Sequence, residues 1–250
     1  MFPEGSAIRR VNQEGVLLIG GGRAILMQLA HPMVARGVAE HSTFESDPLP
    51  RLWRTLEASY TIVFGTLAQA EAVAGHLSRV HEPVRGMGYH ANDPELLFWV
   101  HATLVDSALL VYRHFVGALR PDDIEEYYAQ ASDVAELLGV PRQHQPGSYA
   151  EFRGYMRGAL ATLEPSAVSL KLARSVLHPS LPFPAPLASP LTRWLTAGLL
   201  PAALRRPYGL RWGQTDQRLL QALAAASRSA HTLTPQSLRR LPSRLLRLED

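Results

Sequence analysis

One segment, residues 94–117, constrains the fold of this chain more than any other. Its sequence, PELLFWVHATLVDSALLVYRHFVG, has the spacing of a helix and is apolar on nearly every side. A helix without a polar face is stable in water only when other elements cover it, so we expect this one at the centre of a bundle. His101 and Asp106 interrupt its apolar character.

Helical spacing of apolar residues also dominates the rest of the chain, and almost nothing alternates with the period of a strand. Pro, Gly, Asp and Ser mark the ends of the periodic segments, as in Asp93-Pro94 before one helix and Gly139 after the next. The predicted helices span residues 14–31, 48–64, 69–86, 94–117, 121–138, 148–163, 166–177, 187–199 and 214–230. This pattern predicts an all-α fold.

The glycine run at 20–22 opens the stretch GGGRAILMQLAHP and follows the apolar residues VLLI. A phosphate-binding loop needs a Lys and a hydroxyl residue after its last glycine, and neither follows. The dinucleotide fingerprint needs a third Gly or Ala where Ile25 stands, and a second strand further on. We therefore expect a helix whose glycines allow close approach of a neighbouring helix or a flat cofactor.

The 250-residue chain has no cysteine, which excludes disulfides, thiolate ligands and covalently attached c-type haem. Any metal must then be held by His, by a carboxylate or within a cofactor. The HExxH, ExxH and GxSxG patterns are also absent, which removes zincin, di-iron and serine hydrolase classes. The length and an apolar content of 46% suffice for one large globular domain.

Charge is distributed unevenly along the chain. Residues 1–165 have 13 basic and 19 acidic side chains, a balance of −6, whereas 166–250 have 12 and 3, a balance of +9. The basic residues near the C-terminus are interleaved with Leu and lack aromatic partners, so we expect no nucleic acid. A solvated helix face and contact with an acidic membrane surface both remain open.

Proline residues concentrate at 178–190, HPSLPFPAPLASP, which predicts a boundary. We expect a helical core over 1–178, and over 179–250 a proline-rich linker and a basic helical extension packed on that core. Prolines interrupt the apolar stretch 181–204, and the N-terminus has no apolar signal core. The sequence thus predicts neither a signal peptide nor a transmembrane span, and a cytoplasmic protein with peripheral membrane contact as an alternative.

Polar side chains within apolar surroundings first occur in AHPMVARGVAEHSTFESDP, which contains His31 and Glu40. In the same stretch His41 and Glu45 would lie one turn apart in a helix and could share a ligand or a proton. The simpler interpretation is a helix end with Ser42 as a cap.

Two further stretches contain residues that could bind a ligand or a metal. Arg51, Arg54 and Thr55 lie on one helix face and could bind an anion, a haem propionate or oxygen, or could form only a solvated basic face. In LSRVHEPVRG, His81 is expected in mid-helix with Pro83 just behind it. Such an imidazole can present Nε2 to a metal, although a histidine on a partly apolar face is more often a core residue.

Several motifs taken together resemble one family. GGGRAILMQLAHPMVARGVAEHS, DPLPRLWRTLEASYTIVFG, VHEPVRG, YHANDPELLFWVHATLVDS and EEYYAQASDVAELLGVP resemble, in this order, the MpaB-type and rubber oxygenase family. The resemblance covers roughly residues 8–165 and continues more weakly through GLLPAALRRPYGLRW. It implies a globin-like helical core that binds haem b.

The resemblance also assigns roles to residues. Arg51 and Thr55 match the family's Arg-x-x-x-Thr motif, and His81 is implied as the axial haem ligand and metal-binding residue. Arg54 stands where rubber oxygenase has a Lys, and its guanidinium stays protonated, which leaves the distal position open or filled by water. His101 competes with His81 as ligand.

Two further roles follow from the same resemblance. Glu40 is implied as a catalytic carboxylate beside Arg51 and Thr55, and Arg85 is grouped with Arg54 in cofactor binding. An apolar pocket formed by Phe98, Trp99 and Leu104 is expected to hold an alkene.

The function implied is that of a haem-dependent oxygenase, which uses dioxygen to cleave a carbon–carbon double bond of an apolar, isoprenoid-like substrate. Two alternatives remain open. One is a haem sensor or carrier without turnover, and the other is a haem-free, membrane-associated protein that binds lipids.

Overall fold

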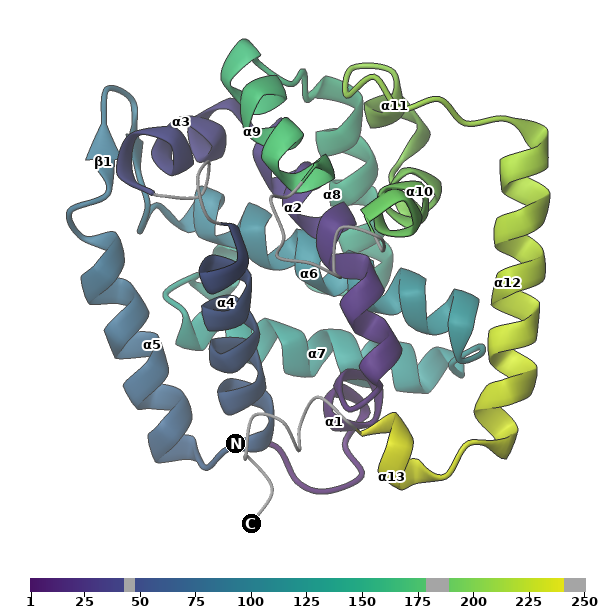
Figure 1. Ribbon diagram of the computed structural model, residues 1–250. Coiled ribbons are helices and arrows are strands. Elements are labelled where there is room, and N and C mark those ends of the chain that lie inside the picture. The colour runs from purple at the N-terminus through teal and green to yellow at the C-terminus, as the bar shows by residue number, and fades with distance from the viewer. Residues whose placement is uncertain (43–47, 179–188, 241–250) are drawn as a thin grey trace.

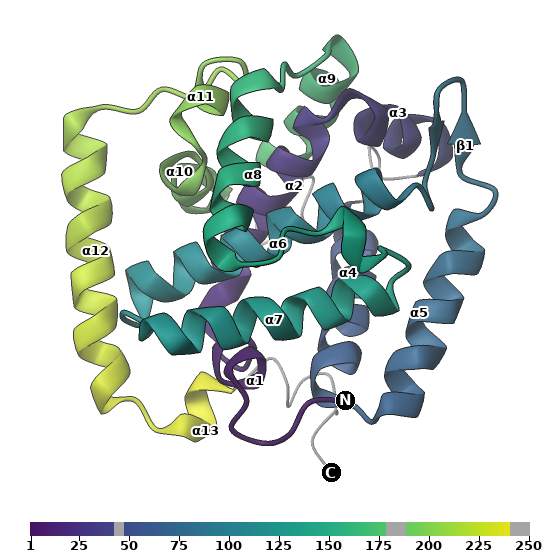
Figure 2. The ribbon, with the colours of Figure 1, turned by 180° about the vertical axis from the view of Figure 1, so that it is seen from behind.

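The computed structural model describes residues 1–42, 48–178 and 189–240, and its helices are arranged around α6 (Figures 1 and 2). The elements in chain order are α1 (Ala7–Asn12), η1 (Gly15–Gly20), α2 (Gly21–Ala30), α3 (Pro32–His41), α4 (Pro48–Phe64), α5 (Leu67–His81), β1 (Arg85–Gly86), β2 (Tyr89–His90), α6 (Pro94–Phe115), α7 (Pro121–Leu137), η3 (Arg142–His144), α8 (Tyr149–Thr162), α9 (Ala167–Leu177), α10 (Ser189–Leu199), α11 (Ala202–Arg205), α12 (Gln214–Leu233) and α13 (Gln236–Arg239). The predicted all-α class is confirmed, because β1 and β2 form the one small sheet of the described part.

Helix α6 is the buried centre that its sequence predicted. Asp93 caps it, since its carboxylate accepts a hydrogen bond from the Glu95 backbone N–H at 2.8 Å. It packs against η1, α2, α7 and α12. Its buried residues are Phe98, Trp99, Ala102, Thr103, Val105, Ser107, Leu109, Val111 and Phe115. By length and hydropathy α6 could also cross a membrane, as could the bent pair of residues 15–30 and 32–41.

The glycine run lies where helices approach one another closely. The expected helix over 14–31 divides into η1 and α2. A Cβ on Gly20 would lie 3.0 Å from Val111 Cγ2 of α6, and one on Gly22 would lie 2.3 Å from Thr196 Oγ1 of α10. The glycines therefore admit neighbouring helices, as one of the two sequence interpretations proposed.

The predicted helix over 69–86 was wrong at its C-terminal end. Helix α5 stops at His81, and a short hairpin follows in which Arg85 pairs with His90 and Gly86 with Tyr89. Pro83 has no N–H to continue the helical hydrogen bonds, which explains the stop. His81 is thus the last residue of its helix and does not lie in mid-helix.

The C-terminal segment is fastened to the rest of the chain. Helix α10 packs on α2 and η1, and α12 stands along the edge of the molecule against α6 (Figure 1). The Tyr208 hydroxyl donates to the Leu26 carbonyl at 2.7 Å, and Leu200 and Leu204 join the main hydrophobic cluster. Residues 189–240 thus share one core with the helices before them. The predicted boundary falls mainly on 179–188, outside the described residues.

Candidate functional site

Helices α4 and α5 bring two of the sequence motifs together. Gly65 and Thr66 alone separate these helices, and Thr66 starts α5 with a capping box to Gln69. The two helices pack side by side (Figures 1 and 2). Arg51 precedes Gly65 by 14 residues and His81 follows Thr66 by 15, so both lie at the same level of an antiparallel pair.

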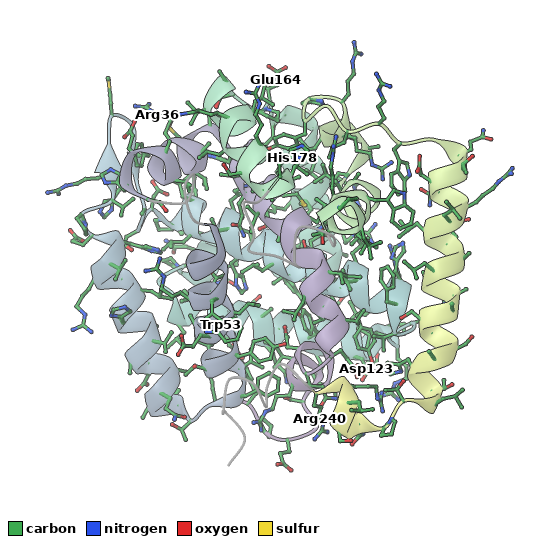
Figure 3. All side chains as sticks on the ribbon, in the orientation of Figure 1. Arg36, Trp53, Asp123, Glu164, His178 and Arg240 are labelled. Atoms are coloured by element: carbon green, nitrogen blue, oxygen red, sulfur yellow. The ribbon has the colours of Figure 1, made fainter. Side chains whose placement is uncertain are left out.

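The Arg-x-x-Arg-Thr motif lies in the first half of α4. Arg54 and Thr55 are exposed, as is the neighbouring Trp53, which Figure 3 labels on this helix. Arg51 belongs to the same helix, but its side chain lies outside what the structure describes. Arg54 and Thr55 are therefore presented on one exposed part of the helix, and the backbone of Arg51 lies about one turn before them.

The hairpin after His81 is fixed to both α5 and α6. Its tip contains Gly88 with φ of +82°, a conformation that favours glycine. The Asn92 side-chain amide donates to the Ser78 carbonyl of α5 at 3.0 Å. Arg85 points away from the interior as an exposed residue of β1. The C-terminal end of α5 and the N-terminal end of α6 thus lie against each other.

Tyr89 attaches the hairpin to α3. Its hydroxyl donates to Glu40 Oε2 at 2.5 Å, and Arg36 lies 3.6 Å from the other carboxylate oxygen. A Cβ on Gly86 would lie only 2.6 Å from the Tyr89 ring, so glycine is needed for this close approach. Figure 3 labels Arg36 on α3 beside this hairpin.

These contacts alter the chemistry of Glu40. The Tyr89 hydrogen bond, followed by Arg36, lowers the pKa of the Glu40 carboxyl, and burial raises the pKa of Tyr89 to about 12. A carboxylate with a lowered pKa is a weaker proton acceptor than an ordinary glutamate. The catalytic role of Glu40 stays a prediction, and its observed contacts connect α3 to the segment after His81.

The side chain of His101 is directed from α6 towards α7. Its Nε2 donates to the Ala131 carbonyl of α7 at 2.8 Å. Burial lowers the pKa of His101 to about 4, so the imidazole is neutral at pH 7. This hydrogen bond occupies Nε2 and joins two core helices, while the role of His101 as a competing ligand stays a prediction.

The apolar residues expected to form a pocket belong to the core. Phe98 and Trp99 are 3% and 2% exposed and join the main hydrophobic cluster, where the Phe98 ring lies 5.0 Å from that of Tyr155. Leu104 is partly buried on the same helix. The Trp99 indole N–H and His31 Nδ1 are both buried without a hydrogen-bond partner among the residues that the structure describes. The sequence marked His31 as polar in an apolar stretch but did not pair it with Trp99.

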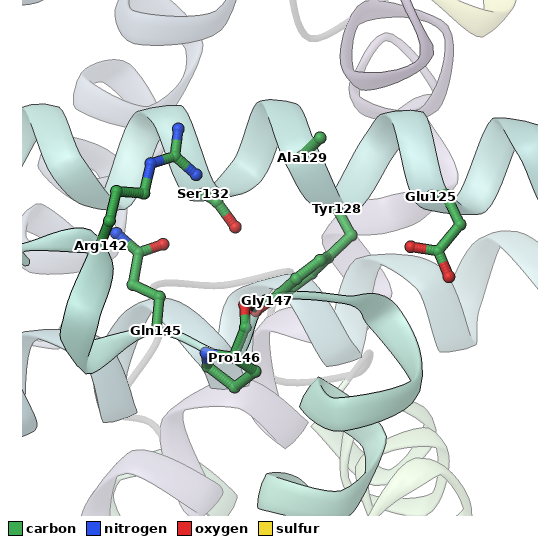
Figure 4. A pocket seen from close by; sticks show the side chains of 8 residues that line it. All are labelled: Glu125, Tyr128, Ala129, Ser132, Arg142, Gln145, Pro146 and Gly147. Atoms are coloured by element: carbon green, nitrogen blue, oxygen red, sulfur yellow. Dashed lines mark hydrogen bonds between the residues drawn. The ribbon is translucent and has the colours of Figure 1, made fainter.

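Two cavities open elsewhere on the molecule. One of about 260 Å³ lies between α7 and the segment before α8, where the Tyr128 hydroxyl donates to the Pro146 carbonyl (Figure 4). The other, of about 360 Å³, lies between η1 and α12, beside Glu14 and His231. Within residues 1–42, 48–178 and 189–240, no three His, Asp or Glu side chains gather as a metal site.

The fold and these residues define an all-α protein of one domain with an Arg-Thr helix packed on a His-bearing helix. The chain belongs to the family described as ER-bound oxygenase mpaB/B'/Rubber oxygenase, catalytic domain, whose model matches residues 8–229. It is therefore a member of an oxygenase family, and the match includes α10, α11 and most of α12 as well as the N-terminal part. Neither a curated protein nor a solved structure matches the chain. The globin-like arrangement of the core stays a prediction.

Proposed function

We propose that this protein is a haem b-dependent oxygenase that uses dioxygen to cleave a carbon–carbon double bond in an apolar, isoprenoid-like substrate. The observation that carries the proposal is the pairing of α4 with α5, at whose shared level Arg51 and His81 lie. Membership in an oxygenase family supports the reaction class.

The side chains around this helix pair suit haem b chemically. His81 offers an imidazole nitrogen that would hold the haem iron, and the exposed guanidiniums of Arg54 and Arg85 would be partners for propionates. Arg54 cannot itself be a ligand because its guanidinium stays protonated. When bound, haem would supply the iron that activates dioxygen.

The chain's own residues would then act by hydrogen bonding and by excluding water. Arg51 and Thr55 would donate hydrogen bonds to the negative charge that develops on oxygen during the reaction. Glu40 is the candidate proton acceptor, although its contact with Tyr89 weakens it as a base. The apolar side chains near the N-terminal end of α6 would keep the substrate's double bond away from water.

The first test is the visible spectrum of the purified protein before and after dithionite and carbon monoxide. We expect a Soret band in the wild type that disappears in His81→Ala and remains in His76→Ala, a matched change of an exposed histidine on the same helix. Loss of the Soret band only in His101→Ala would assign the ligand role to His101 instead of His81. Absence of a Soret band after haem addition would contradict the proposal and favour the lipid-binding alternative.

Measuring oxygen consumption distinguishes a haem oxygenase from a haem sensor or carrier without turnover. A haem oxygenase consumes dioxygen when an alkene such as squalene is added, and yields carbonyl products. A haem protein that shows the Soret band but consumes no dioxygen with any alkene offered would be a sensor or carrier.

We also propose that the basic C-terminal region contacts a membrane surface peripherally. Exposed apolar residues on α12, among them Leu219 and Leu223, lie next to the exposed Arg218. Sedimentation with vesicles should increase with their phosphatidylserine content and decrease with salt. Equal binding to pure phosphatidylcholine vesicles, or none to either, would contradict this.

A further inference from the structure

We propose that His31 and Trp99 form a hydrogen-bonding pair that takes one oxygen atom, a hydroxyl or a carbonyl, of an otherwise apolar substrate. The inference rests on the proposed function, because it names the substrate class of that oxygenase. It distinguishes an oxygenated isoprenoid from a pure hydrocarbon.

The first observation is that two polar atoms are buried together without partners. Trp99 is 2% exposed, and within the described residues its Nε1–H has no acceptor. The His31 side chain is only partly buried, but its Nδ1 atom is inaccessible to solvent and lacks a partner in the same part of the chain. Buried polar atoms are nearly always hydrogen-bonded, because leaving them unpaired costs free energy. The pair therefore indicates a place for a polar group.

The other indoles of known environment offer a contrast. Trp194 Nε1 donates to Asp216 and Trp212 Nε1 donates to Gln217, both at 3.0 Å. Trp99 is the more deeply buried of these three, since Trp194 and Trp212 are partly exposed. The indole that most needs a partner is thus the one without it.

The second observation is that both rings are held by different elements and lie close together. His31 lies at the junction of α2 and α3, where its N–H donates to Gln28 O at 3.1 Å and its carbonyl accepts from Ala35 N at 3.0 Å. The ring centroids of His31 and Trp99 are 6.5 Å apart, with their planes inclined by 41°. One oxygen atom with two hydrogen bonds of about 2.9 Å can connect nitrogens roughly 5 Å apart.

The protonation of His31 selects the chemistry of the ligand. Burial lowers the pKa of His31, and Glu95 opposes this only in part, so the imidazole is neutral at pH 7. A neutral imidazole has one N–H and one lone pair. If Nδ1 of His31 has the lone pair, it accepts a hydrogen bond from a ligand hydroxyl while the Trp99 N–H donates to the same oxygen. If Nδ1 has the proton, His31 and Trp99 both donate to a ligand carbonyl. A hydrocarbon offers neither.

The third observation is the position of the pair in the fold. Trp99 follows Glu95 by one turn at the N-terminal end of α6, and Asn92 just before this end donates to Ser78 of α5. The end of α5 that bears His81 thus adjoins the end of α6 that meets His31. A substrate that extends between them would have its oxygen at one end and its double bond nearer the proposed haem.

The test compares three ten-carbon probes, geraniol, geranial and myrcene, which are an alcohol, an aldehyde and a hydrocarbon. The protein is labelled with ¹⁵N in its tryptophan side chains and studied by NMR, in the ferrous carbon monoxide form where haem is bound. We expect geraniol or geranial to bind at least tenfold more tightly than myrcene and to shift the Trp99 N–H signal. The signals of Trp194 and Trp212 should stay in place.

Variants make the test specific. Trp99→Phe keeps the apolar ring but removes the donor, and His31→Leu removes the second nitrogen, so each should lower the preference for the oxygenated probe to about threefold or less. Trp53→Phe changes an exposed tryptophan and should leave the preference unchanged. Circular dichroism and thermal unfolding identify a variant that has lost its fold, in which case the Trp99 N–H shift in the wild type decides.

Three results would overturn the inference: equal binding of myrcene, a Trp99 N–H signal that none of the probes moves, or an unchanged preference in folded Trp99→Phe. The Soret band of the same samples distinguishes this failure from that of the proposed function. Preference for the alcohol or aldehyde without a Soret band would leave the pair standing and remove the haem oxygenase.

Discussion

Arg23 of α2 and Asp106 of α6 form an ion pair in the interior of the helical bundle. The Arg23 side chain is 4% exposed and that of Asp106 is 21% exposed. Arg23 also donates from Nη1 to Ser107 Oγ at 2.5 Å and from Nε to the Leu199 carbonyl at 2.9 Å. One guanidinium therefore connects α2, α6 and the end of α10, and it accounts for the acidic residue that interrupts the apolar central helix.

Removing the carboxylate should strongly destabilise the protein. Asp106→Ala leaves the Arg23 charge buried without its partner, which typically lowers the free energy of unfolding by about 3–5 kcal/mol. Urea unfolding measures the change. Arg142→Ala is the control, because it breaks the exposed ion pairs with Asp133 and Glu136 and should cost no more than about 1 kcal/mol. Similar losses in both variants would contradict this account of Arg23.

A methyl group at Gly22 should also destabilise the bundle. Its Cβ would lie 2.3 Å from Thr196 Oγ1 and 3.2 Å from Thr196 Cγ2, so this buried threonine must rotate or shift to admit it. We expect Gly22→Ala to cost about 1–3 kcal/mol in thermal or urea unfolding. Thr196→Ala in the same chain should recover part of this loss.

Gly75→Ala is the matched control for that prediction. Gly75 lies inside α5, and a Cβ there meets nothing within 4 Å. This change should raise the free energy of unfolding by about 0.4–1 kcal/mol, because alanine restricts the unfolded chain and favours helix. Equal changes in the free energy of unfolding for Gly22→Ala and Gly75→Ala would show that helix propensity, and not the contact with Thr196, determines the effect at Gly22.

The sequence predicted the elements whose ends have local signals. The helix over 48–64 has the predicted bounds, and Asp93-Pro94 marks the observed start of α6. The β1–β2 hairpin escaped prediction, because its two-residue strands depend on Tyr89 reaching Glu40, 49 residues away. The prediction of the preceding helix ran past Pro83 for a different reason: it followed apolar spacing, although Pro83 is itself a local signal that ends a helix.

For the candidate site, sequence identifies residue types but not their partners. The His81 and Arg51 motifs were found by resemblance, and their common level follows only once α4 and α5 are known to pack as a pair. Nothing in the sequence indicates that the carboxylate of Glu40 accepts from Tyr89, or that His101 donates to a backbone carbonyl. Hydrogen bonds of this kind join residues from different helices and depend on the packed fold.

The stability of the protein should decrease on acidification because of His101. Its pKa is about 4 when folded, against about 6.5 when unfolded, so the unfolded state binds a proton first. The contribution of His101 to the free energy of unfolding is fully present above pH 6.5. It is lost progressively as pH falls towards 4, by at most about 1.4 kcal/mol per pH unit. Urea unfolding at pH 7, 6 and 5 measures the slope.

His101→Gln separates this effect from other titrating groups. The amide of glutamine can donate to the Ala131 carbonyl but does not titrate, so the slope between pH 7 and 5 should become shallower. The free energy of unfolding of His101→Gln should still depend on pH to some extent, because burial also lowers the pKa of His31. An unchanged slope would mean that His101 does not protonate preferentially in the unfolded state.

Tyr89→Phe should loosen the hairpin that follows His81. The change removes the hydroxyl that donates to Glu40 but keeps the ring between α3 and Gly86. Loss of this partly buried, charge-assisted hydrogen bond should lower the free energy of unfolding. Limited trypsin digestion measures the local effect, since cleavage after the exposed Arg85 should accelerate severalfold relative to cleavage elsewhere.

Glu40→Gln completes this test, because its amide oxygen can still accept from Tyr89, although more weakly. Cleavage after Arg85 should then be intermediate between the wild type and Tyr89→Phe. The same order should appear in the haem affinity if His81 is the axial ligand, since the hairpin follows directly from that residue. Faster digestion in Tyr89→Phe with an unchanged Soret band would show that the Tyr89–Glu40 contact holds the hairpin without affecting the cofactor site.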